Sequence, residues 1–342
     1  MNSIIISQNI SVSGEVWYSA LISNDIPQNQ SVIESKIGSI STFSIYREIS
    51  NNQLLDFEYA HRVNQIFSGD SITNKKELNL FNDRLTYNNR FGEPYRLWLR
   101  YSDEKFETRL GLQKIIFGPS KVLRSLSWFD NVDLTDPTGQ IKGVKALLTK
   151  WFPSNTISIW AWSILNQTNN LSFGIRSELS GSSGEWGLNC HKDQYSNIGL
   201  DYRYDGYVGF WSESSLLLSE NINQTVSTLG LDYTLPILNG LYLMAELMSS
   251  KKNKPINSSD QFAAFMVNMP FGINHQVSLI SNIKLNDKKK YHFLRINSAY
   301  NKFSVNYILS INPKRNDYLP VQMPNSLESF GKTIQIMLIY NY

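Results

Sequence analysis

The chain has a single cysteine, little charge and no long hydrophobic run. Cys190 stands alone among 342 residues, which excludes an internal disulfide and any metal site built from several cysteines. Charged residues make up 18% of the chain, below the roughly 25% of a typical soluble protein. No window approaches the roughly 18 consecutive apolar residues of a transmembrane helix, so helical membrane spans are excluded.

Several functional motifs are also missing. The formal net charge of +3 is too small to indicate a nucleic-acid partner, and no basic run is interleaved with aromatic residues. The sequence has no glycine-rich phosphate loop, no Cys–His metal pattern and no helical His pair, so we expect no cofactor and no metal site. The opening "MNSIIISQNIS" lacks the basic and apolar regions of a signal peptide. We expect that any signal peptide is not part of this chain.

What the sequence does contain is alternation of apolar and polar residues with period 2, repeated from end to end. In "YRLWLRYS", Tyr95, Leu97, Leu99 and Tyr101 share one face, and Arg96, Trp98 and Arg100 share the other. Prolines fall in connections or at segment ends, as strands require. The pattern predicts about eighteen strands, near 9–23, 36–50, 53–64, 94–102, 105–117, 141–151, 156–165, 170–179, 184–193, 196–205, 208–217, 224–235, 239–250, 260–269, 274–285, 289–299, 303–312 and 331–342.

The connections between these segments tend to alternate between short turns and longer polar stretches. The short turns include 50–53, 102–105, 181–184, 205–209 and 270–275, and the longest connections are 65–93, 118–140 and 313–330. Strict alternation places all turns at one end of a sheet and all loops at the other. This layout is typical of an up-and-down barrel with both chain ends on the same side.

The composition of the two faces favours a membrane barrel over a soluble β-rich protein such as a propeller or sandwich. Lysines concentrate in the connections, and apolar faces often end in tyrosine, as at an apolar band that meets lipid headgroups. Backbone groups in lipid require a closed sheet. We therefore predict that residues 1–342 form one all-β domain, a single antiparallel transmembrane barrel of about eighteen strands, with sixteen as the alternative count. Short turns would be periplasmic, longer loops extracellular, and the barrel would be integral to the bacterial outer membrane, in contact with its lipid.

Residues 95–148 carry a more specific pattern. The stretch "RLGLQKIIFG" is followed by "RSLSWFD" and an Asp-Pro. This region resembles the hairpin of porin-like outer-membrane proteins of Bacteroidota and, more distantly, is similar to alginate-export-type channels. The resemblance implies an eighteen-stranded channel. It assigns Arg109, Gly111, Gln113 and Gly118 to the strand motif, and Arg124, Trp128, Phe129, Asp130, Asp136 and Pro137 to the loop motif.

The residues themselves predict where this region lies. Segment 105–117 would be an ascending strand whose inner face points into a wide, aqueous lumen. Its loop, 118–140, would then be extracellular and could fold into the lumen and narrow it. The predicted pore-lining or constriction residues are Arg96, Arg100, Glu107, Arg109, Gln113, Arg124, Trp128, Asp130, Asp133 and Asp136.

Two interpretations of the inner arginines stay open. Arg96, Arg100 and Arg109 could form a basic ladder for anionic solutes. Alternatively, they could pair with Asp56, Glu58 and Glu107 on neighbouring strands.

The loop residues also allow two interpretations. Asp130, Asp133 and Asp136 are oxygen ligands of the kind calcium binds, but their spacing matches no EF-hand, and turn formation or salt bridges to Arg124 are the alternative. Trp128 could stack on a sugar ring or anchor the loop to the wall.

The predicted function is a porin or channel for passive passage of small hydrophilic solutes or of a polar chain, and not an enzyme. An alternative is a barrel that acts as a platform or partner for surface lipoproteins or a secretion machine. A third hypothesis, a surface lipase, would use His191, which lies near Asn189 and Asp193. The sequence indicates neither the transported solute nor the oligomeric state.

Overall fold

The computed structural model describes residues 8–26, 32–50, 52–68, 85–87, 90–166, 170–220, 223–237, 239–254, 257–314 and 330–342. No helix in this part of the chain is long and apolar enough to cross a membrane. The strands are β1 (Gln8–Ser23), β2 (Ile33–Ser50), β3 (Gln53–Ser68), β4 (Leu85–Tyr87), β5 (Arg90–Ser102), β6 (Phe106–Gln113), β7 (Val144–Ser154), β8 (Ile157–Leu165), β9 (Leu171–Gly181), β10 (Gly184–Lys192), β11 (Ser196–Asp205), β12 (Gly209–Leu218), β13 (Asn223–Leu235), β14 (Leu241–Lys254), β15 (Ser258–Phe271), β16 (His275–Lys284), β17 (Lys289–Ala299), β18 (Phe303–Ile311) and β19 (Lys332–Asn341).

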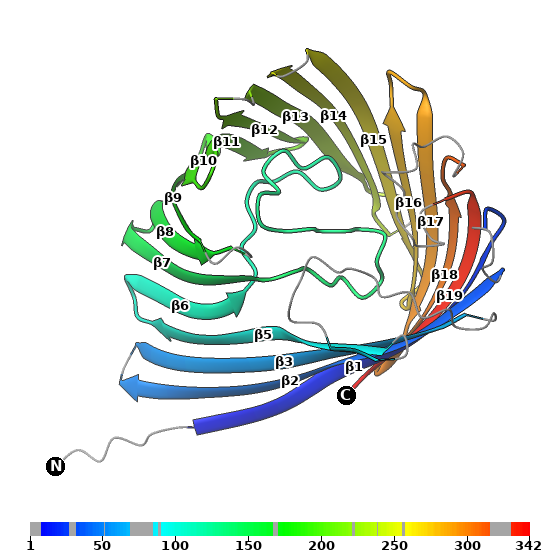
Figure 1. Cartoon of the computed structure of the whole chain (residues 1–342), viewed down its shortest axis with the longest axis horizontal. Helices are drawn as coiled ribbons and strands as arrows, with labels where there is room; N and C mark the ends of the chain where they lie inside the picture. Colours follow the sequence, from blue (N-terminus) through cyan, green and yellow to red (C-terminus); the bar gives the residue numbers. More distant parts are fainter. Residues whose placement is uncertain are drawn as a thin grey trace.

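The strands of the described residues form one closed antiparallel barrel (Figure 1). β4 pairs only with the start of β5, so the other eighteen of the nineteen strands make the ring. Each pairs with its neighbour along the chain, and β1 pairs with both β2 and β19, which closes the sheet. The predicted fold is confirmed, and each of the eighteen predicted segments overlaps one strand of the ring.

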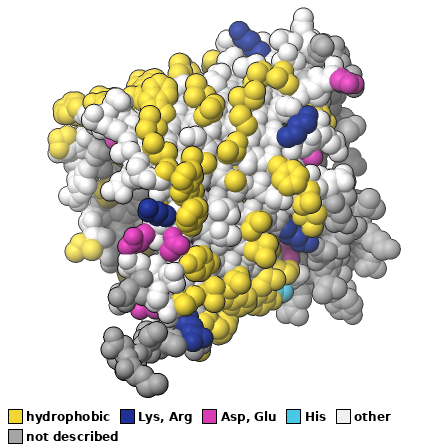
Figure 2. Space-filling view, turned by 90° about the vertical axis from the view of Figure 1, so that its left-hand side faces the viewer, with side chains coloured by type: hydrophobic (Ala, Val, Ile, Leu, Met, Phe, Trp, Pro, Cys, Tyr) yellow, Lys and Arg dark blue, Asp and Glu magenta, His cyan; other side chains and the backbone are white. Residues whose placement is uncertain are grey.

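Alternation decides which side chains face outward. Leu110 on β6 is 59% exposed, whereas Gln113 on the other face is fully buried. Hydrophobic side chains form broad stripes on the outer face in Figure 2, with isolated charged side chains between them. An apolar exterior and a polar interior are the reverse of a soluble protein, and they match a barrel whose wall is solvated by lipid.

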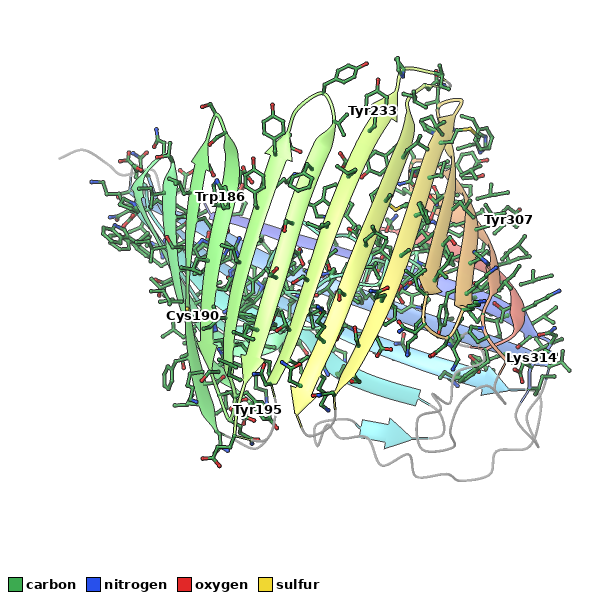
Figure 3. The ribbon with its side chains drawn as sticks, turned by 90° about the horizontal axis from the view of Figure 1, so that it is seen from above. Trp186, Cys190, Tyr195, Tyr233, Tyr307 and Lys314 are labelled. Atoms are coloured by element: carbon green, nitrogen blue, oxygen red, sulfur yellow. The ribbon has the colours of Figure 1, made fainter. Side chains whose placement is uncertain are left out.

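The two rims of the barrel differ as predicted. The turns after β2, β5, β7, β9, β11, β13, β15 and β17 lie at one rim together with both ends of the described chain. Asn52 adopts a positive φ of 73° in the first of these turns, a conformation that asparagine tolerates well. Figure 3 shows Trp186 and Tyr233 toward this turn rim and Tyr195 at the opposite, loop rim. Aromatic residues near both rims are expected where a barrel meets lipid headgroups.

The prediction for Tyr95 was wrong, because this side chain does not lie on the outer face with Leu97. Ala60 pairs with Arg96 and His61 pairs with Pro94, so Tyr95 is the extra residue of a β-bulge. Pro94 lacks a backbone N–H, which explains why the ladder is interrupted there. The Tyr95 ring packs inside the barrel, against a cluster of inward-facing apolar residues that includes Trp17 and Ile40.

The boundaries around the predicted loop also differ from expectation. Strand β6 ends at Gln113 rather than at residue 117, and β7 begins at Val144 rather than at residue 141. Ile115 and Phe117 continue the alternation but are buried in a cluster inside the barrel instead of pairing with a strand. The connection is therefore residues 114–143, called here the inner loop.

Three inward-facing tryptophans lie beside glycines on the neighbouring strand. Trp17 is opposite Gly38, Trp162 is opposite Gly174, and Trp211 is opposite Gly230. A Cβ at any of these glycines would overlap the indole. Each ring can therefore approach the backbone of the wall, which covers the glycine and limits how far the ring projects into the lumen.

Candidate functional site

The inner loop leaves the wall after β6 and lies inside the ring of strands in Figure 1. Its first part, residues 114–129, contacts β12, β13 and β14, and its second part, 130–143, returns past β3 and β5 to β7. Hydrogen bonds join it to inward-facing residues of these strands. The loop therefore crosses the lumen and is attached to the wall on more than one side.

The carboxylate of Glu213 on β12 holds one stretch of this loop. Oε1 accepts a hydrogen bond from the backbone N–H of Ser120 at 2.6 Å, and Oε2 accepts those of Ser125 at 2.9 Å and Leu126 at 3.3 Å. Glu213 is fully buried. Gly118 has a φ of +77°, and a Cβ there would overlap the Glu213 carboxylate, so only glycine fits this approach.

The carboxylate of Glu246 on β14 binds the loop residues that lie between Ser120 and Ser125. Its two oxygens accept the backbone N–H groups of Lys121 at 2.7 Å, Val122 at 3.0 Å and Leu123 at 2.6 Å. The indole N–H of Trp211 donates to the same carboxylate at 3.2 Å. Six backbone donors of segment 120–126 thus meet two buried carboxylates, and such charge-assisted bonds are about twice as strong as neutral ones.

Two hydroxyl groups complete this attachment. Thr228 on β13 donates to the carbonyl oxygen of Leu123 at 2.8 Å, and the hydroxyls of Thr228 and Ser125 lie 2.7 Å apart. Trp128 donates its indole N–H to Ser215 on β12 at 3.0 Å. Trp128 is therefore an anchor to the wall, as one of its two interpretations predicted. We call Glu213, Glu246, Thr228 and Ser215 the clamp.

An aromatic cluster holds the first part of the inner loop against β8 and β10. The rings of Phe117 and Trp162 lie 5.0 Å apart, and Phe129 meets His191 edge to face at 4.9 Å. Trp162 donates its N–H to Nδ1 of His191 at 3.2 Å, and His191 is buried. His191 therefore faces the interior under Phe129, away from the lipid-facing surface that a lipase site would require.

The second part of the inner loop is held mainly by its own turns. Arg124 pairs with Asp130 at 3.0 Å, as predicted for one alternative. Asp133 accepts the N–H and hydroxyl of Thr135, and Asp136 accepts those of Thr138, so both carboxylates form local turns. Among the described residues, no group of three or more His, Cys, Asp or Glu side chains is arranged to hold a metal ion.

Contacts between this second part and the wall are fewer. Arg62 on β3 donates to the side chain of Gln140 at 3.0 Å. Arg96 is buried and donates to the carbonyl oxygen of Ile141 at 2.6 Å, while the Tyr95 hydroxyl accepts the Ile141 N–H at 2.9 Å. Gln113, also buried, donates to the carbonyl oxygens of Arg109 and Ala146 at 3.0 Å. Arg96 therefore supports the loop, whereas Gln113 bonds to strands β6 and β7, and neither faces open water.

The other predicted lumen residues on the wall form an ion-paired network. Arg100 on β5 bonds to Asp56 on β3, with Nε 2.8 Å from the carboxylate, and lies 3.7 Å from Glu107 on β6. Arg109 lies 3.3 Å from the same Glu107 and stacks 4.6 Å from the Trp98 ring. The side chains of Arg100, Glu107 and Arg109 are 27%, 19% and 19% exposed, so water reaches them.

This network continues along the wall into strands that the sequence did not single out. Arg176 on β9 makes bonds of 2.6 and 2.9 Å to Asp201 on β11 and one of 2.6 Å to Glu178. Lys121 of the inner loop pairs with Asp232 on β13 at 3.3 Å. We call the inward faces of β3 and β5–β11 the charged half-wall.

The opposite half of the inner wall is apolar at the level of the loop. Met244, Met266, Ile280 and Phe293 stand in direct register on β14–β17, and Ile308 follows on β18. We call these five residues the apolar row. All are buried, and Val122 and Leu134 of the inner loop pack against the cluster they form. The lumen is therefore filled on this side, whereas water reaches Arg100, Glu107 and Arg109 on the other.

The clamp and Arg176 were missed because each is a single polar residue in an alternating strand. Glu213 in "WSESS" and Glu246 in "MAELM" look like ordinary lumen-facing carboxylates. The one signal available is that each follows a bulky apolar residue on the same inward face, Trp211 and Met244. An aqueous lumen does not require such residues, so they mark positions where something packs.

No known protein family matches the chain, and no curated protein is similar to it in sequence. Solved structures nevertheless share its fold. OccAB3 of Acinetobacter baumannii is 8% identical, with 98% of this chain and 99% of that chain covered and a TM-score of 0.65. OccD3 (OpdP) of Pseudomonas aeruginosa is also 8% identical, with 97% and 91% covered and a TM-score of 0.61.

A third similar structure is OmpF of Salmonella typhi, solved in complex with daunomycin. It is 10% identical, with 97% of each chain covered and a TM-score of 0.53. At such identities the likeness concerns the fold alone, and the specific resemblance of residues 95–148 to Bacteroidota or alginate-export-type proteins stays a prediction. The chain has the barrel fold of outer-membrane porins.

Proposed function

We propose that the chain is an outer-membrane channel for passive passage of small hydrophilic solutes. The observation that carries this proposal is the inner loop, which crosses the lumen, packs on the apolar row and leaves Arg100, Glu107 and Arg109 in contact with water. A loop in this position narrows an eighteen-stranded barrel that would otherwise be too wide to discriminate among solutes. The apolar exterior supports placement in the outer membrane, with turns and chain ends on the periplasmic side.

The water-exposed residues that would line the passage are Arg100, Glu107, Arg109 and Lys121, with Asp232 beside the loop. Cations and carboxylates alternate there, at the separations given above. Opposite charges this close cancel most of each other's field at a distance. We therefore propose that the passage admits neutral and zwitterionic solutes readily and has weak ion selectivity.

The basic-ladder interpretation requires three arginines that face the passage unpaired. Arg100 and Arg109 have carboxylate partners, and Arg96 is committed to the backbone of the inner loop. This arrangement supports pairing as the role of the first two. For Asp130, Asp133 and Asp136, the local turns and the Arg124 bridge support a structural role within the loop.

The test is single-channel recording of the purified protein in planar lipid bilayers. We expect stable current steps, a reversal potential close to zero in a salt gradient, and a reduced current when neutral sugars small enough to enter the lumen are added. Large polymers should leave the current unchanged. Insertion without current would contradict the proposal and favour the platform or partner function. Strong anion selectivity would support the basic-ladder interpretation of the inner arginines.

A further inference from the structure

We propose that Glu213 and Glu246 are positioning residues that keep segment 120–126 of the inner loop against the wall, and that loss of either charge lets this segment enter the passage and interrupt flow. The inference rests on the proposed channel function. It adds what holds the channel open.

The geometry makes these carboxylates specific. Glu213 accepts three hydrogen bonds and Glu246 accepts four, shared between both oxygens of each group. An ionised carboxylate is the one side-chain group whose two oxygen atoms both accept hydrogen bonds and neither donates. A glutamine in the same place would turn an NH₂ group toward at least one N–H group. A change that hardly alters side-chain size should therefore break part of the attachment.

The two carboxylates have backbone donors rather than close cations as their partners. Among the described contacts, neither makes a salt bridge, and Arg124 of the loop bonds to Asp130. Lys121 directs its ammonium group to Asp232 and the Tyr242 hydroxyl rather than to Glu246. The backbone N–H groups of segment 120–126 are thus the main partners of both charges, and each side stabilises the other.

Apart from the two carboxylates, the segment is held by apolar packing and by weaker polar contacts, among them Val122 on the apolar row and the Ser125 hydroxyl on Thr228. Leu123 and Leu126 are buried against the wall, and Thr228 contributes one neutral hydrogen bond. Lys121, partly exposed at 31%, already borders the water-filled side. Once a carboxylate stops accepting the N–H groups, these polar groups gain by meeting water, and water lies toward the passage.

The experiment compares single-channel records of Glu213→Gln, Glu246→Gln and the double variant with the natural protein. We expect brief closures to become about tenfold more frequent in each single variant. A hydrogen bond to a charged group contributes at least the free energy that corresponds to a tenfold change in an equilibrium constant. The double variant should close more often still. Glu185→Gln is the matched control, because Glu185 is an exposed inward-facing carboxylate at the turn end of β10. Its closures should be no more frequent than those of the natural protein.

A reversible cross-link tests whether loop position is the cause. In a Cys190→Ser background, Ser125→Cys and Thr228→Cys place thiols where hydroxyls lie 2.7 Å apart, within reach of a disulfide. When Glu213→Gln is added to this cysteine pair, the channel should close frequently under reducing conditions. After oxidation forms the disulfide, the current should be free of these closures. Closures that persist with the disulfide formed would overturn the proposal, as would glutamine variants as quiet as the natural protein.

A second measurement is independent of conduction. A nitroxide label at Ser127→Cys in the same background, on an exposed loop position, should become more mobile when Glu213 or Glu246 is replaced. Thr228→Val, which keeps both carboxylates, should raise the mobility of the label less than either glutamine variant does. If a glutamine variant does not fold, Thr228→Val replaces it in this comparison. An unchanged spectrum would overturn the proposal. A natural protein that conducts no current, with label mobility that still responds, would instead contradict only the channel function.

Discussion

The two halves of the inner wall solve the problem of a wide barrel in different ways. The charged half-wall pairs its side chains with one another, from the partly exposed Arg100, Glu107 and Arg109 to the buried Arg176 and Asp201. The apolar row removes its side chains from water by packing them under the inner loop. One half therefore depends on charge balance and the other on filled volume, so the two sides should be sensitive to different kinds of substitution.

The largest expected effect is on the charged half-wall at Arg176. Arg176→Met leaves Asp201 buried without its cation, and breaking a buried pair in this way costs about 3–5 kcal/mol. Urea unfolding in lipid vesicles should show this loss in the free energy of unfolding. The double variant Arg176→Met/Asp201→Leu should recover a large part of it. Arg203→Met is the control, because its partner Asp205 is exposed and the loss there should be under about 1 kcal/mol.

The apolar row should respond to volume and not to charge. Ile308→Ala removes buried methyl groups and should lower the free energy of unfolding by about 2–5 kcal/mol, whereas Ile308→Val should cost about 0.5–1.5 kcal/mol. The same vesicle assay measures both. If both variants were as stable as the natural protein, the row would not be packed, and the contrast between the two halves would fail.

Two variants that remove either the cations or the carboxylates of the charged half-wall should change ion selectivity in opposite directions. Arg100→Gln/Arg109→Gln exposes the charges of Asp56 and Glu107, so the passage should become cation-selective, by on the order of tenfold in permeability ratio, or about 1.4 kcal/mol. Asp56→Asn/Glu107→Gln should shift selectivity toward anions. Reversal potentials in a salt gradient give both values. If neither variant changed the ratio, ions would not pass along the charged half-wall.

The smallest effect lies outside the barrel wall, at a turn. The backbone N–H groups of Lys105 and Phe106 donate to Asp103 and lower the pKa of its carboxyl group below the ordinary value. A depressed pKa stabilises the fold above the unfolded value of about 3.9, and this stabilisation disappears as the pH falls through the folded value. Asp103→Asn should therefore be less stable than the natural chain near neutrality, and the difference should shrink in acid. A pH-independent difference would contradict this assignment.

Much of the architecture could be predicted from residue patterns alone. The eighteen strands of the ring, their faces, the end that carries the turns and the region of the inner loop all follow from alternation with period 2 and from turn residues. These signals are local, since each strand shows its two faces without reference to its neighbours. The prediction was wrong for Tyr95, where a bulge at Pro94 shifted the register, because a bulge depends on the partner strand as well as on the sequence of its own.

The sequence by itself therefore determined a closed barrel with an apolar exterior and a polar interior, since lipid and water select side chains one at a time. Only the tertiary structure decided what the interior residues contact. Glu213 meets Ser120 across 93 positions of the chain, and Glu246 meets Lys121 across 125. Such contacts arise because closure of the sheet brings distant strands to face the same lumen, where a buried carboxylate must find donors wherever the loop presents them.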